Sequence, residues 1–328
     1  MILALETSCD DTCAAVVERD GRVRSNVISS QGVHDRYGGV VPEVASRHHV
    51  ELVNAVVDDA LARAGAELSD ADLIAVTRGP GLIGALLVGA QTAKALAAAR
   101  RLPLAPVDHL HGHVAANFLA PLRFDPPFLC LIASGGHTLL ADVRSPERFE
   151  VVGRTLDDAA GEAFDKGARL LGLPYPGGPA LERLARQGDS GAFEFPVAAG
   201  VAGLDFSFAG IKTALLYRLR ELGDEEGRRR RADLAAAYQR AIVEALALRI
   251  ERGLKVTRHR RLALGGGVAA NSALRARVAG LAEEVAVPAP ELCTDNAAMI
   301  ASAARYVRPL AHPGYLDLDV YATGELGL

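Results

Sequence analysis

One stretch decides the fold class: residues 2–28, ILALETSCDDTCAAVVERDGRVRSNVI. Its first segment, Ile2–Glu6, is apolar and predicts a buried strand, and the polar segment Thr7–Thr12 predicts a turn. The chain returns as a second strand over Cys13–Glu18, and a third strand is expected over Arg22–Ile28 after a short Asp-Gly turn. Strands joined in succession by such short turns predict an antiparallel meander at the start of the chain.

The same arrangement recurs in the middle of the chain. Phe128–Ala133 is apolar, Ser134–Thr138 has the composition of a turn (SGGHT), and Leu139–Val143 returns as a second strand. Phe149–Gly153 supplies the third strand of this unit. Two similar hairpin units far apart in one sequence predict an internal duplication.

The segments between and after the two hairpin units alternate between helices and strands. Apolar residues of His48–Ala64 follow helical spacing, whereas Leu73–Thr77 is a short apolar run typical of a buried strand. Further helices are expected over Leu82–Arg100, Asp158–Leu171, Gly178–Gln187, Ala232–Gly253, Ala270–Glu283 and Asn296–Val307, and a further strand over Arg261–Leu264. This alternation predicts an α/β fold.

The size and composition of the chain are those of an ordinary globular protein. Of its 328 residues, 50% are hydrophobic and 23% are charged, which predicts about two domains with substantial cores. The longest apolar run, Gly81–Ala90, is too short to cross a membrane, which takes about 20 such residues. The first residues carry no basic segment of the kind that opens a signal peptide. We therefore expect a cytoplasmic protein that does not associate with membranes.

Neither the cysteines nor the net charge points to a special class of protein. The four cysteines are too scattered for a disulfide framework, and we expect buried thiols at Cys9, Cys13, Cys130 and Cys293. The net charge of −4 argues against a surface that is positive throughout. The arginine run Arg228–Arg231 is therefore interpreted as a solvated helix face, with a local nucleic-acid contact as the alternative.

A histidine cluster, His109-Leu110-His111-Gly112-His113, is the sharpest local sign of chemistry. A helix is expected to begin near Asp108, and residues four apart on a helix share one face, so His109 and His113 would meet at one point. Two imidazoles together with a carboxylate suit iron(II) or zinc. The alternative is a merely polar helix start. The cluster lacks the glutamate of the H-E-x-x-H peptidase motif.

Three turns that follow predicted strands are rich in small or hydroxyl-bearing residues: Ser8–Thr12, Ser134–Thr138 and Gly265–Gly267. The backbone N–H groups of such turns, and of helix starts behind them, bind anions, although each turn could equally be structural. Together the three turns resemble the layout of the actin, sugar-kinase and chaperone-ATPase superfold, in which two duplicated domains clamp a nucleotide.

We therefore expect an α/β fold of two duplicated domains of this type with a central cleft. The N-terminal lobe is predicted to comprise residues 1–108 and a returning C-terminal helix within residues 295–328. The C-terminal lobe is predicted to comprise residues 109–294, with helical insertions.

Ten segments, in this order, resemble the motifs of the bacterial TsaD family, whose archaeal and eukaryotic relatives are the Kae-type and OSGEP proteins. The resemblance extends over nearly the whole chain. The segments are Glu6–Thr12, Tyr37–Glu43, Pro80–Leu86, His109–His113, Ser134–Thr138, Asp157–Lys166, Tyr175–Pro179, Asp205–Phe208, Gly265–Asn271 and Thr294–Ile300.

The resemblance implies an enzyme, a tRNA N6-adenosine threonylcarbamoyltransferase, and a set of site residues. The implied ligands of one divalent metal ion, iron(II) with zinc as the alternative, are His109, His113 and Asp295. For Asp295 a simple helix N-cap is the alternative role. The implied contacts to an adenine nucleotide, threonylcarbamoyl-AMP, with ATP or ADP as further candidates, are Ile132, Ala133, Ser134, Gly135, Gly136, Asp165, Gly178, Glu182 and Asn271.

For the reaction, the implied substrate is a mixed anhydride of threonine N-carboxylate and AMP, and the acceptor is the adenosine of tRNA that lies 3′ to the anticodon. We hypothesise that Asp10 or Asp11 assists removal of the N6 proton, because two adjacent carboxylates lie in one polar turn. The alternative for both is ordinary turn chemistry. The resemblance also implies three partners: tRNA, a smaller TsaB-like paralogue of the same fold, and a TsaE-like P-loop ATPase.

Three rival functions are weaker. A kinase of the same superfold has no use for the histidine pair, and a metallopeptidase would need a glutamate where His111 stands. A paralogue that only binds partners would be expected to lack His109, His113 and the segment around Asp295, which this chain keeps.

Overall fold

The computed structural model describes residues 1–198 and 200–323, which fall into two compact units. Of the described residues, 1–126, 145–148 and 291–323 make up the first unit, and 127–144, 149–198 and 200–290 make up the second. Each unit has its own five-stranded mixed sheet with helices packed on it. Within the described residues, no helix is both long enough and apolar enough to cross a membrane.

The sheet of the first unit is built around β1. Its strands lie in the order β3-β2-β1-β4-β5. β1 pairs antiparallel with β2, which pairs antiparallel with β3, whereas β4 and β5 run parallel to β1. The predicted opening meander is thus confirmed. The bounds are β1 Ile2–Glu6, β2 Asp11–Val17, β3 Val23–Ser30, β4 Leu73–Gly79 and β5 Leu104–Asp108.

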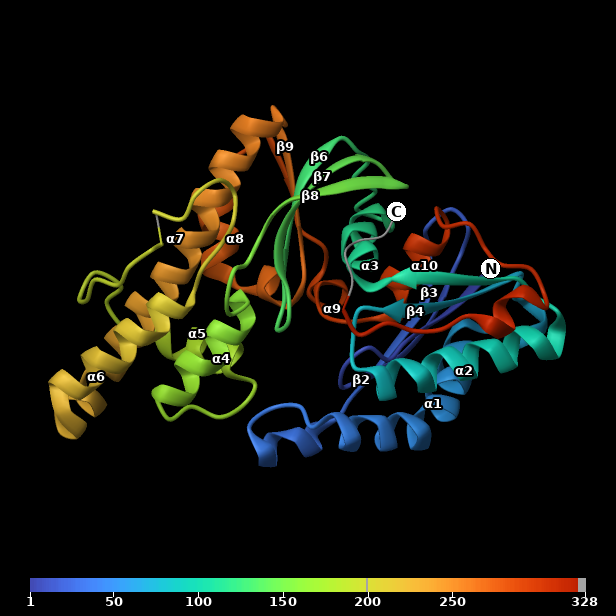
Figure 1. Cartoon of the computed structure of the whole chain (residues 1–328), viewed down its shortest axis with the longest axis horizontal. Helices are drawn as coiled ribbons and strands as arrows, with labels where there is room; N and C mark the ends of the chain where they lie inside the picture. Colours follow the sequence, from blue (N-terminus) through green and yellow to red (C-terminus); the bar gives the residue numbers. More distant parts are fainter. Residues whose placement is uncertain (199, 324–328) are drawn as a thin grey trace. The chain divides into compact units, whose positions relative to one another are not determined.

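Helices cover both faces of this sheet. Residues such as Leu3 and Leu5 of β1 pack with Val53 and Val57 of α1 and Ala93 of α2 in the main core of the unit. Helix α10 packs on β1 and β2, and α3 packs on α10, and Figure 1 shows this pair on the other side of the sheet from α1 and α2. The bounds are α1 Pro42–Ala64, α2 Ile83–Arg100, α3 His109–Ala115, α9 Pro290–Cys293 and α10 Ala297–Ala304.

The sheet of the second unit repeats the topology of the first. Its strand order is β10-β9-β6-β7-β8, so β6, β7, β8, β9 and β10 correspond to β1, β2, β3, β4 and β5. As in the first unit, the central strand pairs antiparallel with the next strand in sequence and parallel with the one on its other side. This equivalence confirms the predicted duplication. The bounds are β6 Phe128–Ala133, β7 Thr138–Ser145, β8 Arg148–Arg154, β9 Arg261–Gly265 and β10 Glu284–Ala286.

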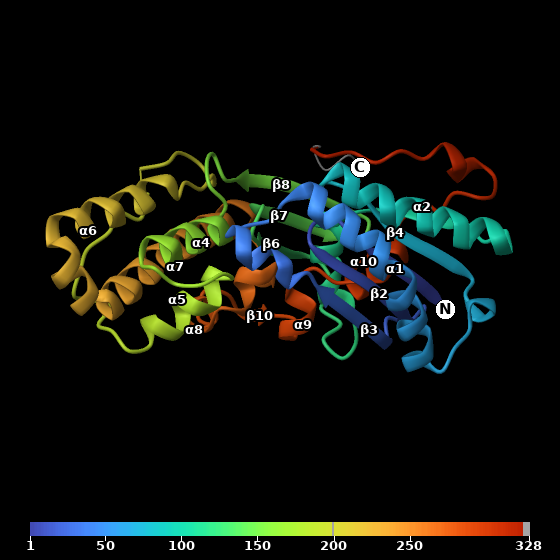
Figure 2. The same ribbon diagram turned by 90° about the horizontal axis from the view of Figure 1, so that it is seen from below.

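In the part of the second unit that the structure describes, α6 is an α-helix that the sequence analysis did not predict. Only Ile211, Leu215 and Gly227 are buried along it, so it has no continuous apolar stripe, and Gly223 interrupts it with φ = 72°. The neighbouring α7 is buried over most of its length. The bounds are α4 Ala160–Leu170, α5 Gly177–Ala185, α6 Ala209–Arg229, α7 Arg231–Thr257 and α8 Ser272–Val278. Figure 2 shows the elements of both units from below.

Several boundaries differ from the expected ones, and α8, for example, ends at Val278 rather than at Glu283. α1 begins at Pro42 rather than at His48, because a proline in the first turn lacks only an N–H that needs no partner there. The first segment of the first unit runs to Pro126, beyond the expected residue 108, and α3 within it packs closely on α10 of that unit. The short 3-10 helices are η1 Gly32–Tyr37, η2 Leu68–Asp70, η3 Ala116–Phe118, η4 Gly267–Ala270 and η5 Gly314–Asp317.

Candidate metal centre and substrate-binding residues

The histidine cluster lies at the start of α3, as predicted. The Asp108 carboxylate, at the end of β5, accepts the backbone N–H groups of Leu110 and His111 and so caps the helix. His109 and His113 lie one turn apart with ring centroids 4.7 Å apart, and both are buried. His111 faces elsewhere and donates from Nε2 to the Pro146 carbonyl. The helix therefore presents two imidazoles to one point.

Asp295 completes this group from a distant part of the sequence. Its Oδ1 lies 3.5 Å from Nε2 of His109 and 3.3 Å from Nε2 of His113. The possible ligand atoms of the three residues all lie within 4.8 Å of one another. The alternative role of Asp295 as a helix cap is wrong, because the side chain of Asn296 caps α10 by accepting the N–H of Met299. The Asp295 carboxylate is therefore available to an ion.

Close packing of α3 on α10 brings these residues together. A Cβ atom at Gly112 would lie 2.8 Å from Cδ1 of Ile300 and 3.2 Å from Cγ of Met299. Ser302 of α10 donates its hydroxyl to the Ala115 carbonyl of α3 at 2.7 Å. Only a residue without a side chain lets the two helices approach this closely, so Gly112 sets the distance between the histidine pair and the segment that carries Asp295.

Glu6, the last residue of β1, supports the centre from behind and was not among the predicted site residues. It is fully buried, and its Oε2 lies 3.0 Å from Nδ1 of His109. The same carboxylate accepts the backbone N–H of Ser8 and the hydroxyl of Thr77. Nδ1 of His109 thus serves as a donor, which leaves Nε2 as the atom that faces Asp295.

The donor set fits a divalent metal ion. Nδ1 of His113 is buried without a hydrogen-bond partner among the described residues, although buried polar atoms normally have one, and the buried Nε2 has only the Asp295 carboxylate before it, at 3.3 Å. Burial alone would lower the pKa of His109, but the carboxylates of Asp295 and Glu6 raise it well above its ordinary value. A cation bound next to His109 would be attracted by the same two carboxylates, Asp295 and Glu6. Two imidazoles and one carboxylate leave further positions open, as in sites of iron(II) and catalytic zinc.

Asp11, the first residue of β2, belongs to the same unit. Burial raises the pKa of its carboxyl group to about 7, and the negative charges of Asp295, Asp10 and Glu6 add to the shift. Asp11 is thus a more basic carboxylate than an exposed one. Asp10 precedes it in the turn between β1 and β2.

The Ser134–Thr138 turn of the second unit has the expected open backbone. The N–H of Ser134 donates to the His137 carbonyl, which closes the turn. Among the described residues, the N–H groups of Gly135 and Gly136 have no partner, and nothing lies within 4 Å of a Cβ built on either. These two N–H groups are the ones that can contact an anion.

The sequence model of the TsaD family, described as tRNA N6-adenosine threonylcarbamoyltransferase, matches residues 22–302. The chain belongs to this family. A protein of the same description from Anaeromyxobacter sp. strain Fw109-5 is 56% identical over 309 residues, 92% of each chain. One from Clostridium perfringens is 50% identical over 333 residues, 100% of this chain and 98% of its own. Membership in the TsaD family confirms the predicted resemblance and identifies the chain as an enzyme, a transferase.

A solved structure supports the fold. The (R)-2-hydroxyglutaryl-CoA dehydratase component A of Acidaminococcus fermentans superposes with a TM-score of 0.56 at 14% identity, over 93% of this chain and 95% of that chain. This likeness concerns the fold alone. Together with the two equivalent sheets, it confirms the predicted α/β fold of duplicated domains of the actin, sugar-kinase and chaperone-ATPase type.

The substrate contacts expected from the TsaD resemblance fall in the second unit, where several of them hydrogen-bond to neighbouring elements. Oδ1 of Asp165 accepts the backbone N–H groups of Gly177 and Gly178 at the start of α5. Oε1 of Glu182 accepts both the backbone N–H and the hydroxyl of Ser272. α5 is thereby fixed to α4 on one side and to the start of α8 on the other.

Asn271 and the last residues of β6 have side chains that are engaged within the protein rather than free to contact a ligand. Oδ1 of the Asn271 side chain caps α8 by accepting the N–H of Leu274, and Nδ2 of the same side chain donates to Oε1 of Gln239. The side chains of Ile132 and Ala133 are fully buried in the sheet, so they could reach a ligand only through their backbone. Their assignment as substrate contacts stays a prediction.

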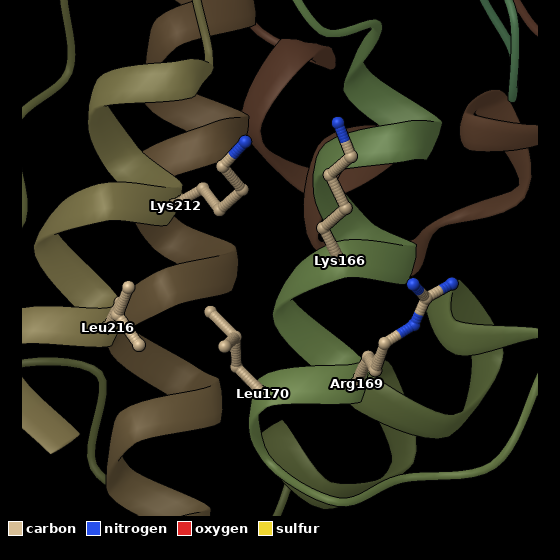
Figure 3. Close-up of a pocket in the computed structure, with 5 residues that line it drawn as sticks. All are labelled: Lys166, Arg169, Leu170, Lys212 and Leu216. Carbon is tan, nitrogen blue, oxygen red and sulfur yellow. The ribbon is translucent and has the colours of Figure 1, made fainter.

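A hollow of about 240 Å³ lies between α4 and α6 of the second unit. Figure 3 shows the amino groups of Lys166 and Lys212 pointing the same way, away from Leu170 and Leu216. Both amino groups pair with Asp158, at 2.7 Å and 3.1 Å. The hollow is therefore lined mainly by apolar stems, and its lysine charges are already compensated by a carboxylate.

Proposed function

We propose that this TsaD-family enzyme transfers the threonylcarbamoyl group from threonylcarbamoyl-AMP to N6 of the adenosine 3′ to the anticodon in tRNA, with the help of one divalent metal ion. The observation that carries the proposal is the grouping of His109, His113 and Asp295, whose possible ligand atoms all lie within 4.8 Å of one another. Iron(II) is the proposed metal and zinc the alternative, since both accept this donor set.

The reaction needs little beyond orientation and charge stabilisation. The N6 amine attacks the carbamoyl carbon, the bond from that carbon to the phosphate oxygen breaks, AMP leaves, and N6 loses one proton. Because the carbonyl is already activated by its phosphate leaving group, alignment of the two reactants supplies much of the acceleration. When bound, the divalent ion would act as a Lewis acid toward the oxygens of the adenylate.

Backbone groups of the second unit are proposed to hold the adenylate. The N–H groups of Gly135 and Gly136 would donate to an oxygen that gains negative charge in the transition state. Asp165, Glu182 and Asn271 would act through the positions of the helix starts that they fix, in addition to any direct contact. Such an indirect role is consistent with the hydrogen bonds that the three side chains accept from backbone N–H groups of the protein.

Asp11 is the better of the two candidates for the proton acceptor. Its pKa of about 7 lets a substantial part of the carboxyl group be ionised at neutral pH while it remains basic enough to take a proton. Asp10 in the adjoining turn is the second candidate. If Asp10→Ala and Asp11→Ala both keep single-turnover rates near wild type, neither residue has this role.

The proposed setting follows from the same family membership. tRNA is the acceptor, a TsaB-like paralogue and a TsaE-like P-loop ATPase are the proposed protein partners, and an adenine nucleotide is the proposed second ligand. We propose the cytoplasm as the location.

The experiment compares wild type, His113→Ala and His48→Ala in a mixture with threonylcarbamoyl-AMP, tRNA and the proposed partner proteins. His48 lies on α1 of the same unit, partly exposed and outside the metal-binding group, and is the matched control. Mass spectrometry of the tRNA nucleosides should show threonylcarbamoyladenosine with wild type and His48→Ala. His113→Ala should lose activity on the order of 100-fold, since a Lewis acid contributes several kcal/mol. Equal product from all three would reject the metal-assisted transfer.

A further inference from the structure

A C-terminal strap, residues 319–322, crosses the end of β4 in the first unit. Nε of Arg78, in β4, donates to the Asp319 carbonyl at 2.8 Å. The backbone N–H of Tyr321 donates in return to the Arg78 carbonyl at 3.2 Å, and the Arg78 guanidinium lies 5.7 Å from the centroid of the Tyr321 ring. The strap is thus fixed at several points to the strand that neighbours β5.

The Tyr321 side chain reaches the residue that starts the metal-binding helix. Its hydroxyl donates to Oδ2 of Asp108 at 2.6 Å. Oδ1 of the same carboxylate accepts the N–H groups of Leu110 and His111. Both oxygens of Asp108 therefore have partners, one set on the helix and the other on the strap, so the cap cannot rotate without breaking one of them.

The β4–α2 turn makes space for the ring and carries a second connection. A Cβ atom at Gly79 would lie 2.7 Å from Cδ2 of Tyr321, so a side chain at position 79 would displace the ring. The N–H of Gly81 donates to the Ala322 carbonyl, and Leu82 donates to the Ser8 carbonyl.

Ser8 extends this second connection to the metal-binding residues. A Cβ atom at Gly81 would lie 2.6 Å from the Ser8 carbonyl oxygen, so the turn and Ser8 are in close contact. Oγ of Ser8 lies 3.2 Å from Nδ1 of His109. The strap is therefore linked to His109 from two sides, through the helix cap and through the Ser8 turn.

We propose that Tyr321 is a positioning residue for the metal centre: through Asp108 it fixes the start of α3 and hence the direction of the His109 and His113 rings. The inference rests on the proposed metal-dependent function, because it assigns Tyr321 a role at that same site. Loss of the hydroxyl leaves Oδ2 of Asp108 without this donor and allows the cap, and with it the histidine pair, to move relative to Asp295.

The test compares Tyr321→Phe with Tyr315→Phe in the full chain. Tyr315 lies on η5 just before the strap, is fully buried, and its hydroxyl has no hydrogen-bond partner among the described residues, so its removal breaks no bond. Zn²⁺ affinity is measured by competition with a chromophoric chelator. The visible spectrum of the Co²⁺-loaded protein reports the geometry of the ligands, and the melting temperature in chelator reports the fold without metal.

We expect Tyr321→Phe to weaken Zn²⁺ binding by about 3- to 30-fold, somewhat less than for a residue that touches a ligand. Its Co²⁺ spectrum should change while its melting temperature in chelator matches that of Tyr315→Phe. Equal affinities and spectra for the two variants would overturn the inference. So would a Tyr321→Phe protein that does not fold, because the role would then be structural. If wild type itself bound no metal, the proposed function would fail first.

Discussion

Glu6 and His109 are joined by a buried hydrogen bond, with Nδ1 of His109 3.0 Å from Oε2 of Glu6. The bond fixes which ring nitrogen carries the proton and turns the other toward Asp295. A carboxylate behind a ligand histidine is the usual support of a metal site, and it raises the basicity of the ligand. The first strand of the sheet therefore contributes to the proposed metal centre through its last residue.

Glu6→Gln should weaken metal binding by about 10- to 100-fold, as expected for a residue that orients a ligand. Glutamine keeps the shape but turns one acceptor oxygen into an NH₂ group, which faces the donors that Glu6 now accepts. The measurement is Zn²⁺ affinity by chelator competition. Glu43→Gln, exposed at the start of α1, is the control and should bind as wild type does. A Glu6→Gln affinity equal to that of the control would contradict the assigned role.

Local spacing predicted the histidine pair, but it could not supply the residues that act on the pair. His109 and His113 are four positions apart, and helical periodicity alone puts them on one face. Glu6 and Asp295 join them only because β1, α3 and α10 pack together, which no local pattern encodes. The family resemblance supplied Asp295. For Glu6 two signals were available: it is an acidic residue that ends an otherwise apolar strand, and it opens the first segment that resembles the TsaD family.

Elements were missed where local propensity and tertiary environment disagree. β5 has Pro106 in its middle, which argues against a strand, but β5 is the edge of its sheet and an edge strand tolerates a missing N–H. α6 is largely exposed and interrupted at Gly223, so it gives no apolar periodicity to detect. The secondary structure of both segments is thus set by their position in the fold rather than by a pattern in their own sequence.

Gly112→Ala should destabilise the protein by about 1–3 kcal/mol and weaken metal binding, because the added methyl group overlaps with Ile300 and Met299 of α10. The free energy of unfolding is measured by urea titration in chelator, and Zn²⁺ affinity separately. Gly210→Ala, in α6 with nothing within 4 Å of the new atom, is the control and should be neutral or stabilise by up to about 1 kcal/mol. If the two variants are equally stable, α3 and α10 do not approach as described.

Metal should stabilise the folded chain through His113. A ligand that binds only the folded state adds about 2.7 kcal/mol at a concentration 100 times its dissociation constant. The melting temperature of wild type and of His48→Asn should therefore rise with added Zn²⁺, and that of His113→Asn should stay constant. The rise should disappear at low pH, where protonated imidazoles no longer bind a cation. A zinc-dependent rise that persists in His113→Asn would place the ion elsewhere.

Asp158 should make the stability of the second unit dependent on pH. Lys166 and Lys212 hold its pKa below the ordinary value of 3.8, despite partial burial. A depressed pKa contributes stability that is present above about pH 4 and is lost as the pH falls through the lower, folded-state pKa. Because both lysines are partly exposed, we expect Asp158→Asn to cost only about 1–2 kcal/mol at pH 7.

Urea unfolding at pH 7 and at pH 3 tests this sign. The difference in unfolding free energy between wild type and Asp158→Asn should shrink at pH 3, below the ordinary pKa of 3.8, because the unfolded chain then takes up a proton that the folded carboxylate resists. Asp224→Asn, on an exposed part of α6, should differ little from wild type at either pH. A difference for Asp158→Asn that is the same at both values would show that its ion pairs do not carry the effect.

Ionisation of Asp11 should control how the single-turnover rate falls on the acid side of its pH profile, called the acid limb below. Its pKa of about 7 applies to the protein without an ion, and a bound divalent cation lowers it, so the limb should lie at or below pH 7. Only the ionised carboxylate accepts a proton, so the single-turnover rate of wild type should fall up to tenfold per pH unit below that point. Asp11→Asn should be slow at every pH and lose this limb, whereas Asp10→Asn should keep it. An unchanged limb in Asp11→Asn would assign the proton acceptor to another group, and loss of the limb only in Asp10→Asn would assign it to Asp10.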